Sequence, residues 1–216
     1  MSQRVEDEKE TGRVEAFSDG VFAIAMTLLI LDVKAPKPAD AAASGGLLMA
    51  LRGQWPTYLA YLTSFATILV MWVNHHKLFR HIHRSNDTLL FLNGLLLLFV
   101  TFVPFPTSLV ADYLQESEAG VAAAVYAGTY LALAIAFNML WLYASGKGRL
   151  LGTRANPTEV RAITRQYRFG PILYAVAFVL AFFSVAASVT LCLLLALFFA
   201  FTGALTRVFG DRRPGT

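Results

Sequence analysis

The sequence predicts an all-α integral membrane protein. Of its 216 residues, 56% are hydrophobic and only 15% are charged, whereas an ordinary soluble domain has about 25% charged residues. The apolar residues form long blocks, and a helix of about 20 apolar residues is enough to cross a bilayer. We predict six transmembrane helices from these blocks. They cover residues 14–34, 55–74, 88–111, 120–145, 170–185 and 188–206.

The first three blocks carry recognisable helix signals. The first is too long for a signal peptide, lacks a small-residue cleavage site and follows an acidic segment, residues 1–12, which we expect to be disordered. The second opens with Trp55-Pro56, and proline is tolerated in the first turn of a helix. The third contains "FVPFPTS", whose two prolines predict a kink or a helix end near the outer face.

The last two blocks are predicted to form a hairpin. Residues 169–206 contain no charged residue, and this run is nearly twice the length needed for one span. We therefore expect a tight turn near "SVAASVT". Before this hairpin, Asn156 is expected to cap a short interfacial helix that starts at Pro157, with its arginines towards lipid phosphates.

The distribution of basic residues predicts the orientation. With a cytoplasmic N-terminus, fifteen of the 18 lysines and arginines lie on the cytoplasmic side, and only Lys34, Lys37 and Arg52 lie outside. This positive-inside bias places both termini in the cytoplasm. Since topology and membrane lipids account for the basic residues, no nucleic-acid partner is expected. Cys192 is the only cysteine, which excludes an intrachain disulfide.

Acidic residues predominate on the predicted outer side. They form either a solvated rim or a weak funnel that concentrates cations. The acids are Asp32, Asp40, Asp112, Glu116 and Glu118.

All four histidines lie in one stretch, "NHHKLFRHIH", as His75, His76, His81 and His83. Membrane metalloenzymes need more ligands spread over several segments, and Asp87 is the only carboxylate near this stretch. We therefore expect no metal, and a metalloenzyme at the His75–His83 cluster is the least favoured reading. The chain also lacks the sequence signals of phosphate loops or catalytic triads, so we do not expect an enzyme.

Polar and apolar residues occupy different faces of the first predicted helix. At about 100° per residue, Ile24, Leu28 and Leu31 share one face, and Thr27 falls between Ile24 and Leu31. Phe17 and Gly20 extend this stripe towards the cytoplasm. Ser18 and Asp19 lie more than about 100° away, on a flank where a neighbouring helix is expected. Periodicity alone favours ordinary lipid-facing or core packing for the stripe.

One family has a similar first helix. The stretch "RVEAFSDGVFAIAMTLLILDV" resembles the R-x-x-x-F-S-D-G signature of the prokaryotic relatives of the lysosomal potassium channel, transmembrane protein 175. "WVNHHKLF" at 72–79 resembles the end of that family's second helix. The resemblance implies a homotetrameric potassium-permeable channel of the plasma membrane, with helix 1 of each subunit lining a central pore. It implies monovalent cations as permeant ions, no cofactor, and no T-V-G-Y-G filter.

The resemblance also assigns roles to residues. It implies that Ile24, Leu28 and Leu31 form the pore constriction, with Thr27 supplying hydroxyl groups. It further implies that a second group of residues holds helix 1 against its neighbours. That group is Arg13, Phe17, Ser18, Asp19, Trp72, Asn74 and His75.

We thus expect a channel domain over residues 13–208, preceded by the cytoplasmic N-terminus and followed by a cytoplasmic tail at 209–216. The main alternative is a secondary transporter, with Asp19 carrying a proton. Broken helices and inverted repeats would favour that alternative, and neither is evident in the sequence.

Overall fold

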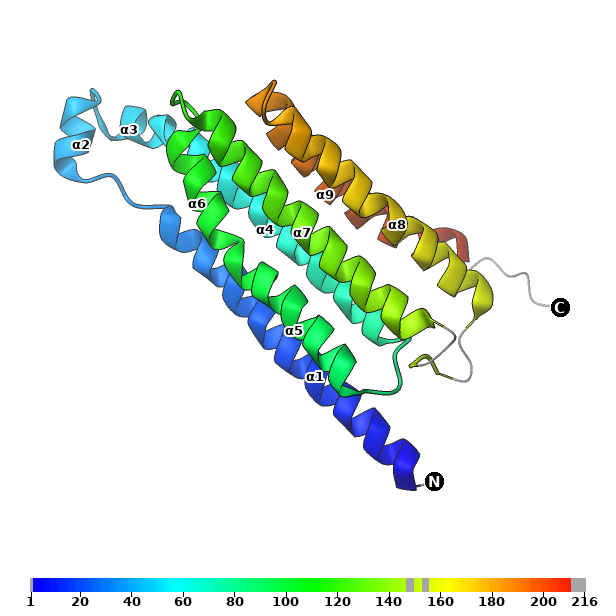
Figure 1. Ribbon diagram of the computed structural model, residues 1–216. Coiled ribbons are helices and arrows are strands. Elements are labelled where there is room, and N and C mark those ends of the chain that lie inside the picture. The colour runs from blue at the N-terminus through cyan, green and yellow to red at the C-terminus, as the bar shows by residue number, and fades with distance from the viewer. Residues whose placement is uncertain (1, 147–149, 153–155, 211–216) are drawn as a thin grey trace.

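The computed structural model describes residues 2–146, 150–152 and 156–210, and these residues form a helical bundle (Figure 1). Its helices are α1 (Ser2–Leu28), α2 (Pro38–Ala43), α3 (Leu47–Gly53), α4 (Trp55–Phe79), α5 (Asp87–Phe102), α6 (Pro104–Tyr113), α7 (Ala119–Ser145), α8 (Pro157–Leu180) and α9 (Val185–Gly210), and a 3₁₀ turn η1 (Leu29–Asp32) follows α1. The long helices run alongside one another, whereas α2 and α3 lie at one end of the bundle (Figure 1).

Four helical segments in the described part of the chain are long and apolar enough to cross a membrane. They are Thr11–Asp32, Trp55–Phe79, Asp87–Tyr113 and Ala119–Ser145. They match the first four predicted blocks, which confirms a multi-pass helical membrane protein. The apolar part of α9, Val185–Phe199, is shorter, so the count of six spans stays a prediction.

The prolines of the third block separate two helices, as predicted. α5 ends at Phe102 and α6 begins at Pro104, with Val103 between them. Because proline has no N–H group, Pro104 and Pro106 interrupt the hydrogen bonding of a continuous helix, yet each fits the first turn of α6. The segment Asp87–Tyr113 therefore consists of two successive helices, α5 and α6, rather than one continuous helix.

α8 and α9 form the predicted hairpin. α8 ends at Leu180, residues 181–184 make the turn, and α9 starts at Val185, so the turn includes the start of "SVAASVT". The backbone N–H of Ser184 donates to the carbonyl of Leu180 at 2.8 Å. The hydroxyl of Ser188 donates to the carbonyl of Ala177 at 2.8 Å and so ties the two helices together.

Two expectations about helix lengths were wrong. The segment before the hairpin is not a separate short helix, because α8 runs without interruption from Pro157 to Leu180. Its predicted cap is present: the side chain of Asn156 accepts a hydrogen bond from Thr158 N at 2.9 Å. At the N-terminus, α1 extends back to Ser2, so the described part of segment 1–12 is helical where we expected disorder.

The side chain of Asn138 explains how α8 passes through Pro171. Proline lacks the N–H group that would bond the carbonyl four residues earlier, which here is the carbonyl of Tyr167. The amide of Asn138, on α7, donates a hydrogen bond to this carbonyl instead. A backbone carbonyl that would otherwise lack a donor is thereby satisfied.

α7 lies in the core of the bundle, and α1 lies at its edge. The side chains of Tyr126, Tyr130 and Trp141 on α7 are almost completely buried. α1 packs against α4 and α5. α1 therefore has one face inside the bundle and one face outside it.

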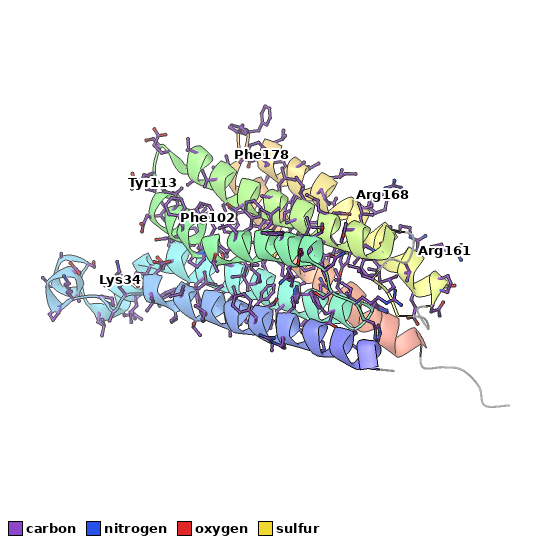
Figure 2. The ribbon with its side chains drawn as sticks, turned by 60° about the horizontal axis from the view of Figure 1, so that its bottom comes forward. Lys34, Phe102, Tyr113, Arg161, Arg168 and Phe178 are labelled. Atoms are coloured by element: carbon purple, nitrogen blue, oxygen red, sulfur yellow. The ribbon has the colours of Figure 1, made fainter. Side chains whose placement is uncertain are left out.

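Basic residues lie at both ends of the molecule. Figure 2 shows Lys34 near one end and Arg161 towards the opposite end.

Candidate functional site

The buried face of α1 follows a regular helical spacing. Ser18, Phe22 and Ala25 of α1, and Leu29 at the start of η1, have no exposed surface, and their spacing of four, three and four residues brings them onto one side of the helix. This side packs against α4 and α5. The opposite side is consequently left uncovered by the described part of the chain.

The predicted apolar stripe occupies this uncovered side. The exposed fractions of Ile24, Leu28 and Leu31 are 58%, 41% and 65%. Leu31 lies in η1 rather than in α1, so the α-helical spacing used for the prediction does not hold for the last member. It nevertheless remains exposed. Thr27 is exposed too, and its hydroxyl donates to the carbonyl of Ile24 at 2.8 Å.

A chain of hydrogen bonds joins the buried face of α1 to α5 and α4. Asn93 lies on α5, and its amide nitrogen donates to the hydroxyl oxygen of Ser18 at 2.9 Å. The Asn93 carbonyl oxygen is 2.9 Å from Nε2 of His75 on α4. Ser18 in turn donates to the carbonyl of Val14 at 2.8 Å. With the Asn93 amide placed in this way, its oxygen accepts from a protonated Nε2 of His75.

A second set of contacts joins the adjacent flank of α1 to α4. The indole nitrogen of Trp72 donates to Oδ1 of Asp19 at 2.8 Å. One turn away, Nδ1 of His76 lies 2.6 Å from Oε1 of Glu15. The rings of Trp72 and His76 stack, with centroids 6.4 Å apart. α4 therefore contacts α1 through a carboxylate at each of two successive turns.

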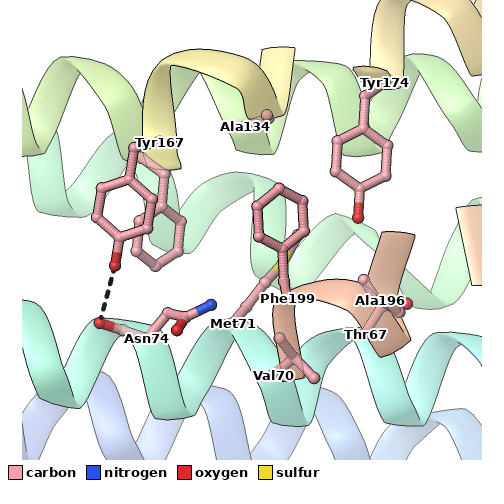
Figure 3. Close-up of a pocket in the computed structure, with 11 residues that line it drawn as sticks. Thr67, Val70, Met71, Asn74, Ala134, Tyr167, Tyr174, Ala196 and Phe199 are labelled. Carbon is pink, nitrogen blue, oxygen red and sulfur yellow. Dashed lines mark hydrogen bonds between the residues drawn. The ribbon is translucent and has the colours of Figure 1, made fainter. Parts of the chain in front are cut away.

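Three residues of the predicted support group, Arg13, Phe17 and Asn74, take no part in these contacts between α1 and α4 or α5. Arg13 and Phe17 line an open groove of about 540 Å³ between α1 and α5, and 68% of the Phe17 side chain is exposed. Asn74 faces away from α1 and lines a small cavity of about 50 Å³ among α4, α7, α8 and α9 (Figure 3). The hydroxyl of Tyr167 donates to the Asn74 carbonyl at 3.4 Å.

The four histidine side chains lie in different environments and do not converge on one metal site. His75 stacks on Phe79 in the core, with centroids 4.4 Å apart, whereas His76 pairs with Glu15. His81 lies near Trp141, and desolvation lowers the pKa of His81 below its ordinary value. The side chain of His83 is exposed. Within the described residues, no group of three or more His, Cys, Asp or Glu is placed to hold a metal ion.

Sequence reasoning missed Asn93 and Glu15. Asn93 is a single amide inside the apolar run "TLLFLNGLLLL", and a lone polar residue in such a run usually bonds to another helix. That signal was available in the sequence. Glu15 offers no comparable signal, because an acid near the end of a membrane helix is ordinarily solvated.

Comparisons with known proteins were made for the whole chain. The family described as "Endosomal/lysosomal potassium channel TMEM175" matches residues 13–104. A potassium channel of Chamaesiphon minutus is 57% identical over 194 residues, covering 90% of this chain and 95% of the relative. A potassium channel of Streptomyces collinus is 48% identical over 193 residues, covering 89% of this chain and 92% of the relative.

A solved structure is also similar. The crystal structure of a lysosomal potassium-selective channel TMEM175 homolog from Chamaesiphon minutus has a TM-score of 0.83 and 54% sequence identity. The match covers 90% of this chain and 98% of that chain.

Proposed function

Because this chain belongs to the TMEM175 family, we propose that it is a potassium channel in which α1 of each of four identical subunits lines a central pore. The observation that carries the proposal is the two-sided character of α1. One side is completely buried at Ser18, Phe22, Ala25 and Leu29, and the other exposes the apolar stripe of Ile24, Leu28 and Leu31.

The stripe supplies the constriction in this proposal. Fourfold symmetry places each side chain in a ring around the pore axis, and rings of apolar side chains gate by dewetting. A slightly wider ring favours the cation that sheds water most readily, so potassium passes more easily than sodium. Thr27 donates its hydroxyl proton to the Ile24 carbonyl, which leaves the lone pairs of its oxygen available to water or a cation in the pore.

The residues behind α1 hold the stripe in position. Ser18 and Asp19 bond to Asn93 and Trp72, which belong to other helices. In this arrangement Asp19 accepts the hydrogen bond of the Trp72 indole and braces α1 against α4. A bracing role for this side chain fits the channel proposal.

We further propose six spans, cytoplasmic termini and a location in the plasma membrane. Arg161, Arg165 and Arg168 are exposed along α8, and Lys34 lies towards the other end of the molecule (Figure 2). The larger basic group marks the cytoplasmic side by the positive-inside rule.

The test is ion flux through the pure protein in liposomes, with potassium compared against sodium. Ile24→Asn is expected to increase flux and to reduce the preference for potassium, because an amide ring holds water in the constriction. Ile24→Leu keeps the ring apolar and should preserve selectivity. Ile172→Asn is a matched control on the exposed surface of α8, away from α1. Unchanged flux and selectivity in Ile24→Asn would remove Ile24 from the pore.

The transporter alternative is separated by repeating the flux measurement with and without a proton gradient. A channel conducts potassium down its own gradient at a rate that the proton gradient does not drive. Net potassium movement against its gradient, powered by protons, would replace the channel proposal by the transporter.

A further inference from the structure

The short helix α3 presents a cluster of exposed apolar side chains outside the bundle. The exposed fractions of Leu47, Leu48 and Met49 are 57%, 61% and 52%, and Leu51 is also exposed. The neighbouring helix α2 contains only proline, alanine and aspartate. Such a concentration of large apolar side chains at a surface marks an interaction site.

The covalent connection of α3 fixes its depth. Only Gln54 separates the end of α3 from Trp55, the first residue of the membrane-spanning helix α4. α3 therefore lies at the boundary where a membrane span begins (Figure 1). Trp55 is itself 47% exposed, and tryptophan is enriched at membrane–water interfaces.

The residues of α3 are arranged as in an interfacial helix. At about 100° per residue, Leu47, Leu51 and Leu48 fall within an arc of about 100°. Gly53 and Met49, whose side chain is 52% exposed, lie on the opposite side, and Ala50 lies between Gly53 and Leu47. Arg52, which is exposed, follows next to the leucine arc. An arginine in this position reaches phosphate groups while its stem stays with the apolar side chains.

We propose that α3 is a membrane anchor that inserts Leu47, Leu48 and Leu51 into the outer leaflet, with Arg52 bound to lipid phosphates. The partner is the surface of a phospholipid bilayer. The chain turns between α2 and α3 at Gly45 and Gly46, whose φ angles are 83° and 121°. α2 then stays in water while α3 lies along the lipid. Only the assignment to the outer leaflet rests on the proposed topology.

The experiment uses a fluorescent thiol label on the full chain in liposomes. Cys192 is the single cysteine and is buried, so Leu48→Cys provides one accessible thiol, and Ala43→Cys on α2 is the matched control. We expect lipids that carry a nitroxide near the head group to remove roughly half of the fluorescence at residue 48, as for an interfacial helix. Iodide in the water should quench the label at residue 43 instead.

Two results would overturn the anchor. Quenching of the residue 48 label by iodide alone would place α3 in water. Protection from both quenchers, together with cross-linking of Leu48→Cys between subunits by a short bis-maleimide, would show that a neighbouring copy covers α3. Leu47→Cys gives a second, independent site if the first variant does not fold.

The sidedness is tested separately with a membrane-impermeant maleimide applied to whole cells. Labelling of Ala43→Cys from outside supports the proposed topology. If only disrupted cells are labelled while lipid quenching at residue 48 persists, the topology is wrong and the anchor lies in the inner leaflet.

Discussion

Asn93 is the residue that joins three helices in the buried network. It donates to Ser18 of α1 and accepts from His75 of α4, and its side chain is nearly completely buried. Hydrogen bonds between membrane helices contribute on average about 0.6 kcal/mol each, with a maximum near 1.7. The network is therefore a modest contribution to stability and a strong constraint on how α1 is rotated.

Asn93→Leu should lower the stability of the folded protein by about 1–2 kcal/mol, because two bonds are lost and the buried Nε2 of His75 is left unpaired, whereas Ser18 keeps its bond to the Val14 carbonyl. The measurement is unfolding in detergent by a denaturant. Leu98→Ala is the control, since Leu98 is on the same helix but largely exposed. Equal stability of Asn93→Leu and the wild-type protein would contradict the role of the network.

Trp72 and Asp19 allow a test of whether their contact stabilises α1. Trp72→Phe keeps an aromatic ring beside His76 but removes the indole N–H that donates to Asp19. If the contact is stabilising, Asp19→Ala, which removes the acceptor, should cost less stability in the Trp72→Phe background than in the wild type. A double-mutant cycle measures this difference. Strictly additive effects would show that the two side chains do not interact.

At the scale of elements, α8 depends on α7 to remain continuous. Asn138 bonds the Tyr167 carbonyl that Pro171 leaves without a helical donor. The bond replaces one intrahelical bond by a contact between helices. The position of the proline thereby fixes which turn of α7 lies beside α8.

Asn138→Leu should destabilise the protein by about 1–3 kcal/mol, the cost of an unpaired buried polar group. Pro171→Ala supplies the missing N–H group and should reduce this cost in the double variant. Thermal unfolding of the wild type, both single variants and the double variant gives the comparison. A double variant no more stable than Asn138→Leu alone would contradict this account of the helix.

At the scale of the whole molecule, the single chain leaves the apolar stripe of α1 exposed while its opposite face is buried. A stripe of Ile and Leu could also face lipid, so the distinction between pore and lipid requires the assembly. The proposed tetramer places four copies of α1 around one axis.

The tetramer predicts that Leu28→Cys residues of different subunits come close enough to cross-link. Four copies should appear as one species in native mass spectrometry, and oxidation should convert the Leu28→Cys protein into covalent dimers. Ile172→Cys, on the surface of α8, is expected not to cross-link. A monomer by mass, with no cross-linking at Leu28, would remove the shared pore.

Local periodicity and hydropathy were sufficient for some features and not for others. The turning of Ser18 and Asp19 away from Ile24 depends only on helix geometry, and the structure places both side chains against other helices. Helix geometry alone did not indicate which helix Asn93 or Asn74 contacts. The sequence of a helix shows which of its residues share a face, but not which helix packs against that face.

The charges of α8 show the same limit. Arg161, Arg165 and Arg168 made the segment before Gly170 look like an interfacial helix separate from the hairpin. Backbone hydrogen bonding does not depend on this change in side-chain polarity, and Asn138 removes the penalty at Pro171. The helix therefore continues where hydropathy indicates a boundary.

The sequence by itself determined the membrane class, the first four spans and the two faces of α1, because each depends on residues close together in the chain. Only the tertiary structure decided that Asn93 connects α1 to α4, that Asn74 faces the cavity behind α4, and that α7 completes the bonding of α8. These contacts join residues 18 to 93 positions apart. Their partners are chosen by the packing of whole helices.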